Sequence, residues 1–176
     1  MTRVGCREVV FLAKKGICFL LVCLLFLVGC HGKSGWNAEQ LFDHICSRID
    51  IPRCEVYRYA SDKSQNKLLS RLYSHGIGDI PPAVAFCDDY LICLYEGNEI
   101  WELHIFRTVS ISDNKRIQEM LVARRDMLQN SEHFSYYSDL TQKRVLTAEV
   151  FSYRNFVILS VTDQNESVRK ALMEIK

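Results

Sequence analysis

The chain has 176 residues, of which 48% are hydrophobic and 24% are charged, and its formal net charge is +1. A chain of this length has room for one domain of ordinary size, which excludes two large domains. The apolar content excludes a disordered chain, because such chains lack the apolar surface that offsets the entropy lost on folding. Nucleic-acid binding normally requires a strongly basic surface, so we expect no nucleic-acid partner.

The amino-terminal segment has the organisation of a secretory signal. Residues 1–15 contain four basic side chains and one acidic side chain, and an apolar run of 12 residues follows from Ile17 to Val28. A helix that spans a membrane needs about 20 apolar residues, so this run is short for a permanent span. A short anchor helix that is never cleaved remains the alternative.

The sequence Leu27-Val28-Gly29-Cys30 follows the apolar run and resembles the lipobox of bacterial lipoproteins. The resemblance implies that residues 1–29 are a lipoprotein signal peptide and that Cys30, carrying fatty acyl chains, becomes the first residue of the mature protein. We therefore expect a protein held by lipid on the extracytoplasmic face of the cell membrane. Residues 30–35 would be a flexible tether and residues 36–176 a single domain.

Four cysteines remain in this domain, namely Cys46, Cys54, Cys87 and Cys93. They allow three disulfide pairings, and the sequence does not choose among them. On one continuous strand Cys87 and Cys93 would be about 20 Å apart, so they can pair only if Asp88-Asp89 is a turn. We favour buried thiols over disulfides. The cysteine spacings match no zinc site, and we expect no metal or other cofactor.

The helices of the domain are indicated by apolar residues at helical spacing. The first helix begins with a capping box between Asn37 and Gln40 and ends near Asp50, before Ile51-Pro52. The other predicted helices are a short one over residues 68–73 that stops at Gly76, a long one from a Ser110–Asp113 capping box to Asn130, and a terminal one opened by Asp163 or Asn165 that buries Val168, Ala171, Leu172 and Ile175.

Alternating apolar and polar residues indicate the strands. The strand-like segments are residues 83–87, 90–95, 99–108, 145–152 and 155–162, with turns at Ile80–Pro82, at 96–98 and around Tyr153-Arg154. Hairpins separated by helices predict an α+β domain of two layers, in which an antiparallel sheet of about four strands packs its apolar face on helices. Its other face, with Glu102 and His104, would then meet solvent.

Several of these segments together resemble a known family. The segment 99–106, a capped helix with Arg124-Arg125, the aromatic residues Phe134 and Tyr137, and the segment 155–161 are similar to the domain of unknown function 4358. That family consists largely of small lipoproteins of Gram-positive bacteria, and either arginine matches the family's helical arginine. The resemblance covers residues 69–176 and implies a lipoprotein, but no known activity.

Two pairs of polar residues have spacings that a catalytic or metal site can use. Glu102 and His104 lie two residues apart on one face of a strand, as a proton-transfer or metal pair requires, although ordinary exposed polar residues have the same spacing. Asp88-Asp89 is better explained as a solvated turn than as a cation or catalytic site. No hydrolase or phosphate-loop motif is present in the sequence.

Two further groups are candidates for pairing or binding. Arg124 or Arg125 could reach a strand carboxylate such as Glu99 or Glu149 and so fix the long helix to the sheet. Tyr136 and Tyr137, with Tyr153, are candidates for a surface that stacks on a glycan or peptide, although packing of the loop against the sheet is the simpler interpretation.

The function predicted from these features is a non-catalytic binding or interaction module, tethered to the membrane and engaging an envelope protein, peptide or glycan. The alternative is an extracytoplasmic enzyme acting on cell-envelope material through an unrecognised site. A deep pocket with mutually hydrogen-bonded titratable groups would favour the enzyme, and a shallow aromatic patch would favour binding.

Overall fold

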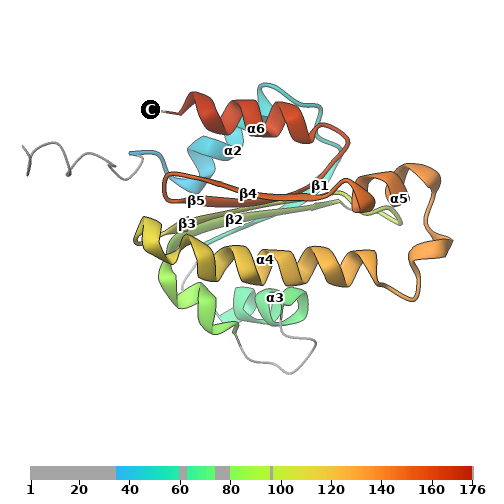
Figure 1. Cartoon of the computed structure of the whole chain (residues 1–176), viewed down its shortest axis with the longest axis horizontal. Helices are drawn as coiled ribbons and strands as arrows, with labels where there is room; N and C mark the ends of the chain where they lie inside the picture. Colours follow the sequence, from blue (N-terminus) through green and yellow to red (C-terminus); the bar gives the residue numbers. More distant parts are fainter. Residues whose placement is uncertain (1–34, 60–62, 74–79, 96, 176) are drawn as a thin grey trace, which may run out of the picture. The chain divides into compact units, whose positions relative to one another are not determined.

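The computed structural model describes residues 35–59, 63–73, 80–95 and 97–175, with the backbone alone at residues 63–66 (Figure 1). The expected signal peptide, Cys30, all of the expected tether except its last residue, and the expected helix stop at Gly76 lie outside the described residues. All described residues belong to one unit, Lys33–Lys176. None of the helices among them is long and apolar enough to cross a membrane.

A five-stranded antiparallel sheet runs through this unit, in the order β1-β2-β3-β5-β4. Its strands are β1 (Cys54–Arg58), β2 (Cys87–Tyr95), β3 (Glu102–Thr108), β4 (Glu149–Tyr153) and β5 (Phe156–Val161). The strand β1 is not predicted from the sequence, because an alternation over five residues is too short to distinguish a strand from a loop.

Helices cover both faces of the sheet, with α2 and α6 on one side and α3 and α4 on the other, while α5 lies at one end (Figure 1). The helices are α2 (Ala38–Cys46), α3 (Lys63–Tyr73), α4 (Asn114–Gln129), α5 (Asp139–Leu146) and α6 (Asn165–Glu174). The α+β class is confirmed. The two-layer arrangement is wrong, because the domain has three layers and neither face of the sheet is left to solvent.

Each face of the sheet has its own apolar core. On the α2/α6 face, which includes Trp101, Leu103 and Ile105, the buried side chains form one cluster. On the α3/α4 face, Phe106 belongs to a second cluster with helix residues such as Ile117 and Leu121. Side chains alternate between faces along a strand, so a strand covered on both sides is apolar almost throughout. The strand β5, with sequence F-V-I-L-S-V, is buried at every position.

Of the three helix starts predicted from capping residues, one is confirmed and two are wrong. The Asn37–Gln40 capping box at α2 is present with both of its hydrogen bonds. The box predicted for Ser110 and Asp113 is wrong, since the Ser110 hydroxyl contacts Ser112 and a 3-10 turn precedes α4. At α6 the cap residue is Gln164, and neither of the two predicted cap residues serves.

Segment boundaries differ from prediction in two further places. Residues Pro82–Phe86 form a 3-10 helix in place of the strand expected from Ala83. The strand expected from residue 145 begins at Glu149, because the preceding residues belong to α5. The hairpin between β4 and β5 turns at Arg154-Asn155, where Arg154 has a positive φ of 53°.

Candidate functional site

A chain of four polar side chains crosses the interior between the sheet and the α3/α4 layer. Tyr73, at the end of α3, is hydrogen-bonded through its hydroxyl to Nδ1 of His104 in β3. The Nε2 atom of His104 lies 3.1 Å from Oε2 of Glu102. Glu102 in turn accepts two hydrogen bonds from Arg124 of α4, with Nη2 at 2.5 Å from Oε1 and Nε at 3.2 Å from Oε2.

The two-residue spacing along β3 and the helical spacing along α4 bring these groups into one layer. Glu102 and His104 share a face of β3, two residues apart, and the next position on that face is Phe106 of the α3/α4 core. On α4, Ile117, Leu121 and Leu128 form the buried stripe, and Arg124 falls within the same stripe. Arg124 therefore extends from the buried side of its helix toward the sheet.

The predicted solvent exposure of Glu102 and His104 is wrong. Glu102 is 6% exposed and His104 is fully buried, because α3 and α4 cover their face of the sheet. Polar side chains normally face water because water satisfies their hydrogen bonds. Here Arg124 takes the place of water as the partner of Glu102, and Tyr73 takes its place as the partner of His104. The proximity expected of a Glu–His pair is present, but in the interior of the domain.

Burial and charge determine the protonation of this group. Burial alone raises the pKa of Glu102, but the Arg124 guanidinium outweighs burial and lowers that pKa to about 2. Burial lowers the pKa of His104 and raises the pKa of Tyr73 well above its ordinary value. Near neutral pH the group therefore consists of a carboxylate, a guanidinium, a neutral imidazole and a phenol.

One atom of the group is incompletely satisfied. Although His104 Nε2 is close to Glu102, the geometry makes no hydrogen bond, and Nε2 is the one buried side-chain polar atom without a hydrogen-bond partner in the described part of the chain. The Glu102 carboxylate is oriented by its two hydrogen bonds from Arg124. The His104 imidazole therefore approaches it at an angle unsuitable for a hydrogen bond. A buried polar atom in this state is destabilising.

A cavity of about 710 Å³ opens against the Glu102–Arg124 pair. Its lining combines apolar, hydroxyl, amide and charged side chains, and consists of Ile100, Glu102, Ala123, Arg124, Asp126, Met127, Leu128, Asn130, Ser131 and Tyr137. A second cavity, of about 270 Å³, lies between α3 and the start of β3 and shares Ile100, Glu102 and Arg124 with the first. The ion pair thus stands in the wall common to both cavities.

The predicted ion pairs have other partners in the structure. Arg124 does fix the long helix to a strand, as expected, but through Glu102 and not through Glu99 or Glu149. Arg125 pairs with its neighbour Asp126. Helix α5, which the sequence analysis does not predict, supplies the partner of Glu99.

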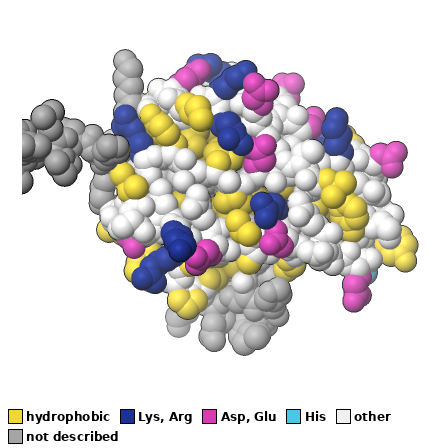
Figure 2. Space-filling view, viewed as in Figure 1, with side chains coloured by type: hydrophobic (Ala, Val, Ile, Leu, Met, Phe, Trp, Pro, Cys, Tyr) yellow, Lys and Arg dark blue, Asp and Glu magenta, His cyan; other side chains and the backbone are white. Residues whose placement is uncertain are grey.

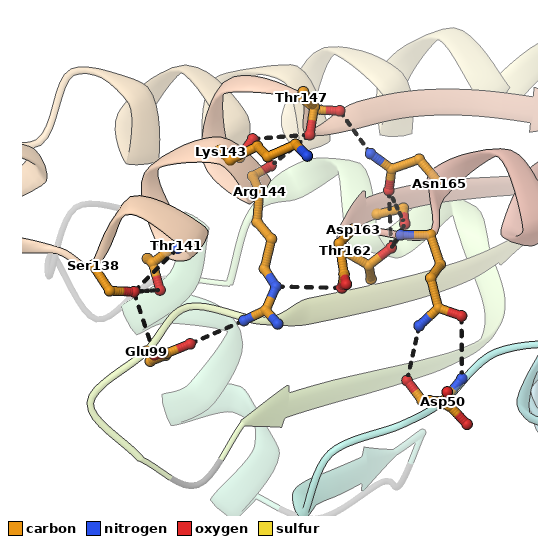
Figure 3. Close-up of polar contacts among 12 residues, drawn as sticks. Asp50, Glu99, Ser138, Thr141, Lys143, Arg144, Thr147, Thr162, Asp163 and Asn165 are labelled. Carbon is orange, nitrogen blue, oxygen red and sulfur yellow. Dashed lines mark hydrogen bonds and ion pairs between the residues drawn. The ribbon is translucent and has the colours of Figure 1, made fainter.

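Figure 3 shows this partner, Arg144, extending between Glu99 and Asp163 at one end of the sheet. Its Nη1 atom lies 3.0 Å from Glu99, and its Nε atom lies 3.4 Å from Asp163. Glu149 is paired with Arg169 of α6. Glu149 therefore ties α6 to β4, Glu99 ties α5 to the connection between β2 and β3, and neither carboxylate meets the α4 arginines.

The tyrosines predicted as a binding surface are divided. Tyr136 is 83% exposed on the α4–α5 connection, and the adjacent Tyr137 is half-buried and lines the larger cavity. Tyr153 ends β4 and packs against the α2/α6 core, on the other face of the sheet. The structure therefore brings Tyr137 to the candidate site and excludes Tyr153 from it.

The acidic pair Asp88-Asp89 is not a solvated turn. Both residues lie within β2, where the register shifts at a bulge. Asp88 is paired with Arg107, and Asp89 accepts a hydrogen bond from the Ala38 backbone at the start of α2. Within the described ranges, no three His, Cys, Asp or Glu side chains are grouped as a metal site would require.

Met127, Asn130 and Ser131 line the cavity, but none of them is predicted from the sequence as a site residue. They surround the end of α4, and no spacing distinguishes them from an ordinary helix end.

In comparisons with known proteins, no family model matches the chain, no curated protein matches its sequence, and no solved structure matches its fold. The site itself is therefore the basis for a functional argument.

Proposed function

We propose that the chain is a lipid-anchored extracytoplasmic protein whose folded part is a non-catalytic binding module, with the larger cavity as its ligand site. The observation that supports the site is the cavity wall, where Glu102 holds the Arg124 guanidinium in one orientation by two hydrogen bonds. A positioned guanidinium beside apolar side chains is typical of a binding pocket, because the apolar lining supplies affinity and the fixed donor supplies orientation.

The protonation states favour binding over catalysis. A general acid or base works best with a pKa near the operating pH, and Glu102, with a pKa of about 2, stays ionised. His104 does not line either cavity, and burial keeps it neutral. Mutually hydrogen-bonded titratable groups are present beside a cavity, which is the arrangement expected of an enzyme, but none of them is poised to exchange a proton with a ligand.

The lining favours a ligand without net charge. Glu102 already neutralises Arg124, and Asp126 is neutralised by Arg125. An additional anion or cation would have to compete with these partners, whereas hydroxyl, carbonyl and amide groups can use the N–H groups of Arg124 that Glu102 leaves available. A peptide or glycan of the cell envelope has such groups.

The face of the molecule in the view of Figure 2 carries charges of both signs. In Figure 2, basic and acidic side chains are interspersed with hydrophobic ones over the described residues of this face, and neither sign of charge predominates.

Two parts of this proposal rest on the sequence, namely the lipid anchor and the family resemblance. The lipobox-like segment ending in Cys30 and the resemblance to the domain of unknown function 4358 both point to a lipoprotein. Mass spectrometry of the protein isolated from membranes tests this part. We expect a mature chain that begins at Cys30 and carries acyl groups, and an intact leader with an unmodified Cys30 would contradict the anchor.

The binding site is tested by crosslinking in the native envelope followed by pull-down. We compare the unaltered chain with Met127→Arg, which fills the cavity, and with Met173→Arg, which places the same charge on an exposed position of α6. The proposal predicts a specific peptide, protein or glycan partner that Met127→Arg loses and Met173→Arg keeps. A Cys30→Ala variant controls for anchoring.

Two results would count against the proposal. Equal recovery of the partner with both methionine variants would remove the cavity as the ligand site. Turnover of an envelope fragment by the purified protein would favour the enzyme.

A further inference from the structure

Three of the four described cysteines gather on one face of the sheet. Cys46 ends α2, Cys54 begins β1 and Cys93 lies in β2. Cys93 is fully buried in the α2/α6 core, and Cys46 and Cys54 are partly buried against the same core. The fourth, Cys87, belongs to the core on the opposite face.

The β2 bulge separates Cys87 from the others. Cys87 and Cys93 are six residues apart in one strand, so simple alternation would place them on the same face. The register shift between Cys87 and Asp89 inserts one residue and moves Cys87 to the other face. Because β2 continues through both positions, the structure also excludes a bond between Cys87 and Cys93.

The strand register makes Cys54 and Cys93 neighbours. Cys54 is opposite Tyr95 and Val56 is opposite Cys93, so the two cysteines occupy diagonal positions two residues apart on one face. Diagonal neighbours of this kind lie about 7–8 Å apart, so a small movement of one strand brings their side chains together. Burial and the nearby Cys54 thiol both raise the pKa of Cys93, as expected for two thiols that lie close together.

We propose that Cys54 and Cys93 become joined by a disulfide bond when the chain folds in the presence of a disulfide oxidant. In the reaction two S–H bonds break and one S–S bond forms, while the oxidant's S–S bond is reduced to two thiols, which take up the two protons and two electrons. Cys54 is the residue that adjusts to the required sulfur distance, because it starts an edge strand paired only with β2.

Folding is the stage at which this bond forms. In the folded chain, burial raises the pKa of Cys46 to about 11 and also raises the pKa of Cys93, so these thiols stay protonated and react slowly. In the unfolded chain they have ordinary pKa values and exchange readily. An oxidant present during folding therefore links the pair, whereas the same oxidant added to the folded, reduced protein acts far more slowly.

The test uses the full chain, denatured, reduced and refolded in detergent with a mixture of reduced and oxidised glutathione. The protein is then unfolded in acid-quenched denaturant and its remaining thiols are blocked with N-ethylmaleimide, before digestion with trypsin and chymotrypsin. Chymotrypsin cuts after Tyr90 and so separates Cys87 from Cys93. Mass spectrometry is expected to find a Cys54–Cys93 linked peptide that disappears on reduction, with Cys46 and Cys87 alkylated.

Matched variants assign the bond. Cys87→Ser and Cys46→Ser are expected to keep the linked peptide, and Cys54→Ser is expected to lose it and leave Cys93 alkylated. Alkylation of both Cys54 and Cys93 in the refolded chain, or a peptide linking Cys46 to either of them, would overturn the proposal.

Discussion

Arg124 and Glu102 join the longest described helix to the third strand through two hydrogen bonds, and both side chains are largely withdrawn from water. A buried pair of this kind costs much of its attraction in desolvation, so it stabilises the fold less than its geometry suggests. The main effect of the pair is to orient the Arg124 guanidinium. One carboxylate holds the guanidinium at the wall between two cavities.

Removing the charge of Glu102 should destabilise the domain strongly. In Glu102→Gln the Arg124 guanidinium remains buried without a carboxylate, and we expect the free energy of unfolding to fall by about 3 kcal/mol. Urea denaturation measures this change. In the control Glu39→Gln, which breaks an exposed pair with Arg58, the free energy should change by less than about 1 kcal/mol.

The double variant Glu102→Met with Arg124→Met separates stability from function. Two apolar side chains replace the two charges together, so no buried charge is left alone, and the domain should unfold within about 1 kcal/mol of the unaltered protein. The envelope partner should nevertheless be lost in the crosslinking experiment. A double variant as unstable as Glu102→Gln would show that the pair itself maintains the fold.

Stability should fall in two steps as the pH is lowered. His104 has a lowered pKa in the fold, so below its ordinary value of 6.5 the unfolded chain binds the proton more readily and stability declines. Glu102 keeps its charge in the fold down to about pH 2 but takes up a proton near 4.5 when unfolded, so its contribution is lost over that lower range. Urea denaturation at a series of pH values measures both steps.

The variant His104→Gln identifies the first step. It cannot titrate, so its stability should vary less between pH 7 and 5 than that of the unaltered protein, while the decline below pH 4.5 remains. Parallel stability curves over the upper range would mean that another group is responsible for the first step.

Tyr73→Phe should remove the hydrogen bond to His104 and leave the buried Nδ1 atom without its partner. A buried polar atom deprived of its partner costs about 1–3 kcal/mol, and the free energy of unfolding should fall by that amount. Tyr136→Phe is the matched control, because Tyr136 is exposed and should show a change below about 0.5 kcal/mol. Equal effects of the two substitutions would argue against the buried contact.

The β4–β5 turn offers a stabilising substitution. Arg154 has a φ of 53°, in the left-handed region that asparagine adopts more readily than arginine. Arg154→Asn should raise the free energy of unfolding by about 0.5 kcal/mol, whereas a β-branched residue in Arg154→Val should lower it. Thermal denaturation of the two variants checks the order. An Arg154→Asn protein that melts below the unaltered one would show that the Arg154 side chain, which lies over Tyr153, outweighs the backbone preference.

Features that depend on residues close together in the chain can be predicted from the amino-acid sequence. Three features follow from local spacing and are present in the structure: the Asn37–Gln40 capping box, the alternation of the predicted strand 99–108, which buries Leu103 and Ile105, and the buried stripe ending at Ile175. Such features involve neighbours within one helix turn or one strand, so periodicity and capping chemistry suffice to predict them.

What each helix or strand faces depends on how distant segments pack together. Alternation places Glu102 and His104 on one side of β3, but whether that side meets water depends on α3 and α4, which come from other parts of the chain. The partner of Arg124 is 22 residues away, and Cys54 and Cys93 meet through a strand pairing that no local pattern encodes. Burial and pairing of polar groups are properties of the packed layers, so they arise only when distant segments are brought together.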